Sequence, residues 1–181
     1  MITNERDTRT ERLLQVANEM MTAARTAPKA KGIDIIEIML VTGDTINQLS
    51  EGMVNYRKKS GLKFMLRDSA NILNAEAIIL IGTKQQINKM NCGYCGFETC
   101  EEKQKQLRVP CAINSVDVGI AIGSACSVAA DHRVDCRVMF SVGRVAQELE
   151  LMPGCSNIYG IPISCSSKNP FFDRVSTAPA K

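Results

Sequence analysis

The sequence predicts a mixed α/β domain in which helices cover a β-sheet. Apolar runs of the length of buried strands alternate along the chain with segments whose hydrophobic residues recur at helical spacing. The chain has 181 residues, of which 45% are hydrophobic and 23% charged, and these values suit a single globular core. We therefore expect residues 1–181 to form one domain.

The first helix and the first strand are predicted from the residues at their ends. Thr8 and Glu11 have the spacing of a capping box, and apolar residues then follow at helical intervals as far as Pro28. The Ile-rich run Ile33–Val41 lies between a glycine and a turn sequence, which predicts a buried strand.

The next elements follow the same rules. Thr45 and Gln48 predict a second capping box, and Gly61 lies just beyond the charged end of that helix. A short helix is expected over 68–73, and the apolar run 77–82 predicts another buried strand.

After an interruption, the alternation of elements resumes in the second half of the chain. We expect a small-residue-rich helix over 113–131, a strand over 137–142, a helix over 143–151 and a last strand over 157–164. Within the first of these helices, small residues predict close approach of a second copy: Gly119, Gly123, Ala125 and Ala129.

The interruption contains a cysteine motif. Residues 90–112 lack a periodic pattern but contain four cysteines with the spacing C-x2-C-x4-C-x10-C. These are Cys92, Cys95, Cys100 and Cys111. Gly93 and Gly96 allow the positive-φ turns with which a chain surrounds an inorganic cluster and directs amide donors at its sulfurs. The pattern predicts an inserted metal-binding segment.

The motif favours a [4Fe–4S] cluster over the alternatives, which are a structural zinc ion or four unligated cysteines. A zinc ribbon usually has two C-x2-C pairs, whereas this sequence has one. The spacing also resembles the C-x2-C-G-x3-C motif of corrinoid iron–sulfur proteins. The other four cysteines lie in apolar segments and are interpreted as ordinary buried residues; they are Cys126, Cys136, Cys155 and Cys165.

Composition argues against several classes of protein. The net charge is +3, aromatic residues make up 4% and tryptophan is absent, so a nucleic-acid-binding surface is not expected. The first thirty residues are charged where a signal peptide is apolar, and the apolar runs are shorter than a bilayer requires. We expect a cytoplasmic protein without a membrane partner. The single histidine, His132, is expected at the surface near a helix end.

Three stretches together resemble a family of uncharacterised bacterial and archaeal proteins that contain a ferredoxin domain. The first is the sequence NCGYCG from Asn91, and the second runs from Asp117 to Asp135. The third extends from Tyr159 to Arg174 and includes the sequence SKNPFFDR. The resemblance covers nearly the whole chain, and it implies a cluster-binding protein without naming a reaction.

A second resemblance is to the flavin-dependent nitroreductases. The sequence AARTAP before Lys29 is similar to the end of their first helix, and Ile158–Pro162 to their last strand, which precedes basic residues that hold the flavin phosphate. The nitroreductase pattern has Ser and Asn where this chain has Lys29 and Gly32. The resemblance implies a nitroreductase-like α+β sandwich that forms a homodimer.

If FMN binds, the resemblance gives its phosphate four candidate cations: Lys29, Lys31, Lys168 and Arg174. The leading hypothesis is electron transfer through the cluster, coupled to a flavin at the dimer interface; an enzyme of this kind would be a flavin-dependent oxidoreductase. The alternative is a structural or redox-sensing dimer stabilised by zinc or a cluster. The sequence names neither the substrate nor the redox partner.

Overall fold

The computed structural model describes residues 1–174 as a sandwich of helices around one sheet. Its four strands pair antiparallel in the order β1-β2-β4-β3. The strands are β1 (Ile36–Val41), β2 (Ala77–Lys84), β3 (Asp135–Cys136) and β4 (Cys155–Ser164). The helices are α1 (Glu5–Thr26), α2 (Asp44–Ser60), α3 (Phe64–Ile72), α4 (Cys100–Gln104), α5 (Ala112–Asp131) and α6 (Phe140–Glu148), with short 3-10 helices η1 (Ala30–Gly32) and η2 (Pro170–Phe172).

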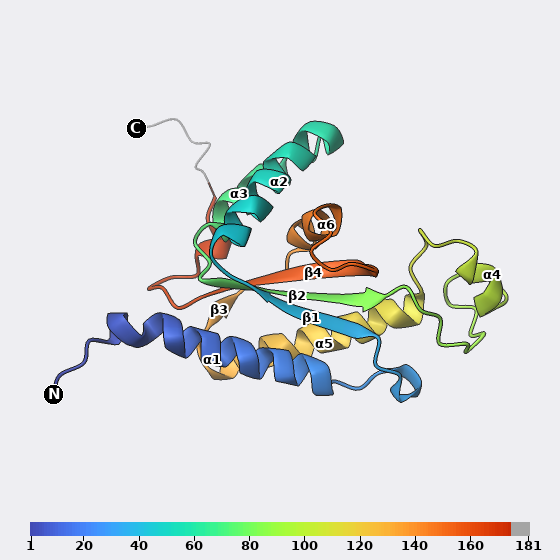
Figure 1. The fold of residues 1–181 in the computed structure, drawn as a ribbon, viewed down its shortest axis with the longest axis horizontal. Coiled ribbons are helices and arrows are strands. Elements are labelled where there is room, and N and C mark those ends of the chain that lie inside the picture. Colours follow the sequence, from blue (N-terminus) through green and yellow to red (C-terminus); the bar gives the residue numbers. More distant parts are fainter. Residues whose placement is uncertain (175–181) are drawn as a thin grey trace.

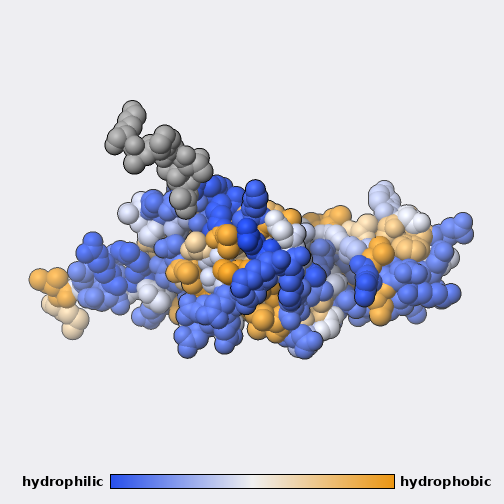
Figure 2. Space-filling model, turned by 90° about the horizontal axis from the view of Figure 1, so that it is seen from above, coloured by the Kyte–Doolittle hydropathy of each residue, from blue (hydrophilic) through white to orange (hydrophobic). Residues whose placement is uncertain are grey.

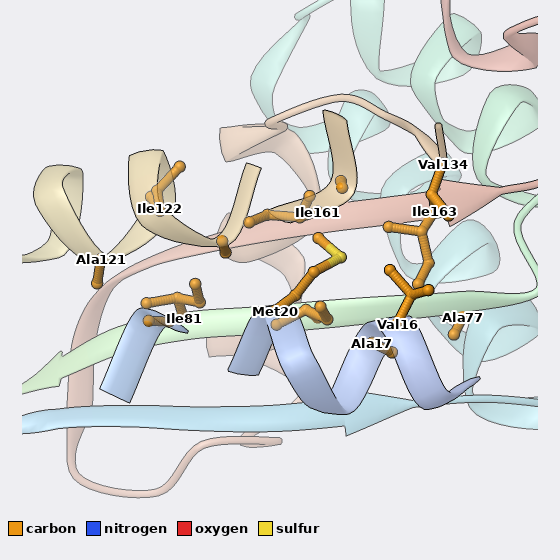
Figure 3. Close-up of a cluster of buried hydrophobic side chains, with 14 of the residues drawn as sticks. Val16, Ala17, Met20, Ala77, Ile81, Ala121, Ile122, Val134, Ile161 and Ile163 are labelled. Carbon is orange, nitrogen blue, oxygen red and sulfur yellow. The ribbon is translucent and has the colours of Figure 1, made fainter. Parts of the chain in front are cut away.

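The sheet separates two hydrophobic cores. Helices α1 and α5 cover one face, and α2, α3 and α6 cover the other (Figure 1). Figure 3 shows the first core, where Val16 and Met20 of α1 meet side chains of β2, β4 and α5. Alternate residues of β2 enter opposite cores, Ile79 and Ile81 the first and Ile78 and Leu80 the second. This arrangement confirms the predicted α+β sandwich.

Helix α6 lies unusually close to β4. A Cβ atom added at Gly143 would stand 1.7 Å from the carbonyl oxygen of Ile158, so no residue with a side chain fits there without displacing the helix. Helix and strand backbones are therefore in direct contact at this point.

Several predicted elements are confirmed with small shifts of their ends. Helices α1 and α2 and strands β1, β2 and β4 overlap their predicted ranges, and Gly61 ends α2 in the left-handed conformation with φ 74°. Both capping boxes are wrong. Helix α1 begins four residues before Thr8 would cap it, and the side chain of Asn4 accepts from the N–H of Arg6 instead. Helix α2 follows Gly43, which offers no side-chain cap.

The strand predicted over 137–142 is wrong. Pairing with β4 ends at Cys136 apart from an isolated bridge at Met139, and α6 has already begun at Phe140. Val142 packs into the second core from α6 and Met139 from the residue before it, whereas Val138 and Phe140 are exposed. A short apolar run fits a helix as well as a strand.

Helix α5 has a buried and an exposed side. Ala125 and Ala129 are fully buried against the first core, so the predicted small-residue dimer face is wrong for these two residues. A Cβ atom added at Gly119 or Gly123 would meet no atom within 4 Å. Val116 and Ile120 beside them are 56% and 38% exposed. The helix thus presents an apolar outer side.

By length and composition alone, α5 would be able to cross a membrane, with a mean hydropathy of 1.4. The expectation that every apolar run is too short is therefore wrong for this helix. Its inner side nevertheless carries buried polar residues with partners: Asp117 accepts from the N–H of Ala30 at 3.1 Å, and Asn114 donates to the carbonyl of Gln86 at 2.9 Å. These contacts identify α5 as an internal helix of the sandwich.

His132 is the C-cap residue of α5, as predicted from its position. Its side chain is 33% exposed and its ring nitrogens contact Glu19 at 2.6 Å and Arg12 at 3.0 Å, both on α1. The histidine therefore joins the C-terminal end of α5 to the middle of α1.

Candidate metal centre

The cysteine segment, residues 85–111, joins β2 to α5 and projects from one end of the sheet (Figure 1). Seen from above, this projecting end carries apolar residues among polar ones (Figure 2). Apart from α4 the segment has no regular structure, which agrees with its lack of sequence periodicity. The predicted insert, 90–112, begins five residues after the start of this segment and includes Ala112, which already belongs to α5.

The structure brings all four predicted cysteines to the wall of one pocket. Cys92, Cys95 and Cys100 enter it from the loop, and Cys111 enters from the residue that caps α5. All four are free thiols of intermediate exposure. Apolar side chains complete much of the wall: Ile87, Met90, Phe97 and Ile113. Four sulfur ligands in an apolar surrounding form a donor set typical of iron–sulfur and zinc centres.

Local backbone chemistry produces this arrangement. Gly93 and Gly96 have φ values of 72° and 86°, and the N–H of Gly96 donates to the carbonyl of Gly93 at 2.9 Å. This tight turn lets Cys92 and Cys95 face the same side. Asn91 closes the loop, because its side-chain oxygen accepts from the N–H of Cys100 at 2.8 Å. Its own N–H donates to the sulfur of Cys100 at 3.3 Å.

A helix cap that was not predicted positions the third cysteine. The Thr99 hydroxyl accepts from the N–H of Glu102 at 3.1 Å, and a Glu102 carboxylate oxygen accepts from the N–H of Glu98 at 3.3 Å. Cys100 is consequently the first residue of α4. The Thr99–Glu102 spacing was the available signal, since T-x-x-E typically marks a helix start.

Two further polar residues line the pocket and were not predicted. Lys103 on α4 is 7% exposed, and its positive charge offsets negative charge that thiolates bring. Asn88 is 3% exposed, and its side-chain oxygen has no hydrogen-bond partner among the residues described. An apolar pocket with an unpaired acceptor and a buried cation accommodates a further polar or charged group.

The residues present fit a thiolate-bound metal centre once the segment adjusts around it. Within residues 1–174, no three His, Cys, Asp or Glu side chains stand at mutual metal-binding distances. The open space between the four cysteines is about 10 Å³, close to the minimum for one water molecule. A metal centre held by all four sulfurs therefore needs this loop to rearrange, and the irregular segment is the part of the fold best able to do so.

The four cations predicted for a flavin phosphate fall into two separate groups. Lys29 donates to the carbonyl of Ala27 at 2.8 Å, and Lys31 donates to the carbonyl of Asn88 at 3.1 Å. Lys168 pairs with Asp173 at 2.7 Å, and Arg174 donates to the carbonyl of Phe172 at 2.8 Å. The chain after α1 and the chain after β4 lie at opposite ends of the sheet (Figure 1), so the two groups do not meet within one chain.

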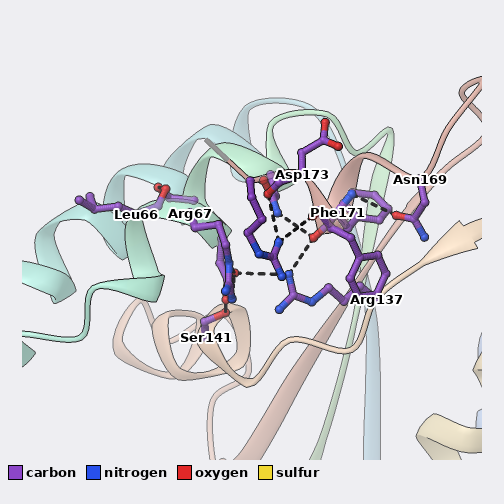
Figure 4. A network of polar contacts seen from close by, with 12 residues as sticks. Leu66, Arg67, Arg137, Ser141, Asn169, Phe171 and Asp173 are labelled. Carbon is purple, nitrogen blue, oxygen red and sulfur yellow. Dashed lines mark hydrogen bonds and ion pairs between the residues drawn. The ribbon is translucent and has the colours of Figure 1, made fainter. Parts of the chain in front are cut away.

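A polar network involves the stretch of chain that contains the second group, Lys168 and Arg174 (Figure 4). Arg137 donates to the carbonyl of Phe171 at 2.7 Å, and its guanidinium lies over the Phe172 ring, 5.1 Å from the centroid. Asp68 is buried beside it and accepts from Arg67 at 2.7 Å. Burial lowers the pKa of Arg137, Asp68 opposes this effect, and Arg67 and Arg174 add to it. The network binds the end of the described chain to α3.

The comparisons with known proteins identify the family. Residues 108–174 match the family described as "Uncharacterized protein containing a ferredoxin domain" (DUF2148). An uncharacterised protein of Archaeoglobus fulgidus is 37% identical over 182 aligned residues, which cover 96% of this chain and 98% of the relative. This chain belongs to the ferredoxin-domain family DUF2148. The match to the DUF2148 model includes Cys111, whereas the other three pocket cysteines precede it.

The DUF2148 chain also resembles solved structures of flavin-binding proteins. A BluB-like flavoprotein from Clostridium difficile has a TM-score of 0.59 and 15% identity, covering 91% of this chain and 85% of its own. A nitroreductase with bound FMN from Bacteroides fragilis has a TM-score of 0.59 and 10% identity, with 92% and 83% coverage. At these identities the similarity establishes the nitroreductase-like fold.

The remaining four cysteines of the DUF2148 chain lie in the sandwich. Only Cys155 is buried; Cys126, Cys136 and Cys165 are of intermediate exposure, so the expectation of four buried residues is wrong for these three. A hydrogen bond with Cys136, together with burial, raises the pKa of Cys126, and the same hydrogen bond lowers the pKa of Cys136. Burial raises the pKa of Cys155 and of Cys165.

Proposed function

We propose that this protein carries a [4Fe–4S] cluster on Cys92, Cys95, Cys100 and Cys111 and functions in electron transfer. One observation carries the proposal: four cysteines from an irregular projecting segment line a single apolar pocket. The ferredoxin domain in the description of the family supports it. A bound cluster of this type accepts and releases one electron at a potential that its surroundings determine.

The chain's own residues have distinct tasks in this proposal. The N–H of Asn91, 3.3 Å from the sulfur of Cys100, stabilises negative charge on that ligand. The buried Lys103 lowers the electrostatic cost of adding an electron nearby. Ile87, Phe97 and Ile113 limit the access of water to the sulfurs.

The alternative is a structural or redox-sensing protein in which zinc, or a cluster without electron-transfer activity, holds the segment. Its support is the same donor set, because four thiolates also bind zinc. Metal content distinguishes the two, since zinc carries no inorganic sulfide and does not absorb visible light.

The test is anaerobic purification or reconstitution of the full chain with iron and sulfide. We expect about four irons and four sulfides per chain, the stoichiometry of the cluster type, with a visible absorption that bleaches on reduction. Zinc bound in place of iron after anaerobic handling, or no bound metal, would overturn the assignment.

The proposal includes FMN as a second cofactor, held by Lys29, Lys31, Lys168 and Arg174. FMN is bound in the nitroreductase structure from Bacteroides fragilis, which shares the fold. Because the two pairs of cations do not meet in one chain, a phosphate held by both requires two copies. FMN binding and a homodimer are therefore proposed together.

The outer side of α5 is the surface proposed for that homodimer. Val116 and Ile120 are exposed, and the absence of side chains at Gly119 and Gly123 permits close approach of a second backbone. Light scattering of the unmodified protein at micromolar concentration should give twice the mass of one chain. The Ile120→Glu variant should give the mass of a single chain. A monomer in the unmodified protein that still binds FMN would contradict the two-copy flavin site.

A further inference from the structure

A second cavity lies where the cysteine segment meets the sandwich. Its volume is about 700 Å³, within the range of small-molecule binding sites. Polar side chains from the two ends of the cysteine segment, from α6 and from β4 line it: Gln85, Arg108, Arg144, Gln147, Ser156 and Asn157. Gln85 follows β2, Arg108 belongs to the cysteine segment, and the others come from α6 and the start of β4. We call this cavity the segment cleft.

The backbone at the segment cleft departs from regular sheet geometry. The register between β2 and β4 shifts between Ile81 and Thr83, which marks a β-bulge in β4 at Asn157 and Ile158, opposite Gly82. Asn157 itself has φ 54°, a left-handed conformation that a non-glycine residue rarely adopts. Irregularities of this kind re-aim a side chain, and here they turn the Asn157 amide away from its strand neighbours.

Hydrogen bonds link the cleft to a proposed metal ligand. The amide nitrogen of Asn157 donates to the hydroxyl of Ser115 at 2.9 Å. That hydroxyl in turn donates to the carbonyl of Cys111 at 3.0 Å. A molecule that contacts Asn157 is therefore two hydrogen bonds away from the backbone of the fourth pocket cysteine.

The charges of the cleft favour an anion. The lining contains two guanidinium groups and no carboxylate. Outside the lining, the carboxylate of Glu148 pairs with Arg144 at 3.5 Å. Arg144 is also held by Tyr56, whose hydroxyl accepts from it at 3.1 Å. A guanidinium fixed in this way binds carboxylate or phosphate with little further loss of entropy. The amides of Gln85 and Gln147 can donate to and accept from a polar ligand body.

We propose that the segment cleft binds a small organic anion, through a carboxylate or phosphate group on Arg108 and Arg144, and that its binding perturbs the metal centre through Asn157, Ser115 and Cys111. The binding site stands independently of the metal. The perturbation rests on the proposed function, because it requires a centre at Cys111.

Calorimetric titration of the full chain tests the binding site with and without metal. The probes are citrate for carboxylate and glucose 6-phosphate for phosphate, with glucose as the neutral control. We expect saturable binding of at least one anion, and the one that binds identifies the group recognised. Arg108→Gln and Arg144→Gln should each weaken it about tenfold or more, whereas Arg6→Gln, at the far end of α1, should not.

Absence of saturable binding by both anions, or equal affinity in the two cleft variants and the unmodified protein, would overturn the site. Titration of the metal-free protein measures anion binding in the cleft alone. A wrong metal assignment would therefore not cause the loss of anion binding.

The visible spectrum of the metal-loaded protein tests the link. The bound anion should shift it, and Ser115→Ala should abolish the shift while the anion still binds. Ser127→Ala, the same change on an exposed turn of α5, is the matched control and should keep the shift. Anion binding with an unchanged spectrum, or a protein that holds no metal, would refute the perturbation and leave only the binding site.

Discussion

The pocket cysteines and the sandwich cysteines occupy different kinds of surroundings. The first four lie in a projecting segment whose single helix has five residues, and they line one apolar pocket. The other four lie on α5, on β3, at the start of β4 and just after it, beside the packed cores. The number of cysteines alone therefore does not indicate a metal site. Four cysteines that line one pocket in an irregular segment, where no packed core requires them, favour metal binding.

Substitution of one cysteine from each group should have the largest effect. Cys95→Ser should lower bound iron by more than about tenfold, because a hydroxyl replaces a thiolate ligand. Cys126→Ser should leave the iron content unchanged. Iron and sulfide assays after identical anaerobic reconstitution measure both variants, and equal iron contents would remove the distinction between the groups.

Metal removal should affect the segment much more than the sandwich. Without metal the loop loses the centre that would cross-link its cysteines, so trypsin should cleave at Lys89, Lys105 or Arg108 about tenfold faster after chelation. Cleavage within α2, at Arg57 or Lys58, is the internal control and should change little. Mass spectrometry of the fragments locates the sites; faster cleavage throughout the chain would show that the metal stabilises the whole fold.

The rates of alkylation of two sandwich thiols, Cys136 and Cys126, should differ by a smaller factor. Because Cys136 accepts a hydrogen bond from Cys126, the pKa of Cys136 is lowered and that of Cys126 is raised. At any pH below its usual pKa, Cys136 therefore has more thiolate, and we expect iodoacetamide to modify it several-fold faster.

The control for this reaction is Cys126→Ala, which removes the donor. The midpoint of the pH–rate curve for Cys136 should then move to higher pH. Peptide mapping at intervals follows both residues, and a midpoint that stays in place would show that the hydrogen bond does not control this thiol.

Lys103→Gln should have the smallest effect. Removal of a buried positive charge makes reduction of a nearby centre less favourable, so the midpoint potential should fall by tens of millivolts with the metal still bound. Lys105→Gln removes the same charge from an exposed position two residues away and should change the potential less. A redox titration followed by visible absorption compares them, and equal shifts would assign the effect to net charge.

Part of this structure is predictable from short-range patterns. The buried faces of α1 and α2, the apolar strands β1 and β2 and the left-handed Gly61 follow from periodicity and glycine chemistry. Helix starts were less predictable, because Thr8 and Thr45 have capping spacing yet lie inside helices that begin at Glu5 and Asp44. A Thr followed three residues later by Glu or Gln is compatible with a helix start, but the same spacing also occurs inside a helix that starts earlier.

The sequence alone indicated helices that cover a sheet and singled out the four pocket cysteines, since hydrophobic periodicity and cysteine spacing are local properties of a chain. Its resemblance to the nitroreductases implied the sandwich. Tertiary structure decided what those properties meet. It turned Ala125 and Ala129 inward, separated Lys29 from Arg174, and buried Lys103 beside the cysteines. It also made one cleft from residues on β4, α6 and the cysteine segment. Contacts between residues far apart in the chain depend on how whole elements pack, and no local pattern encodes that packing.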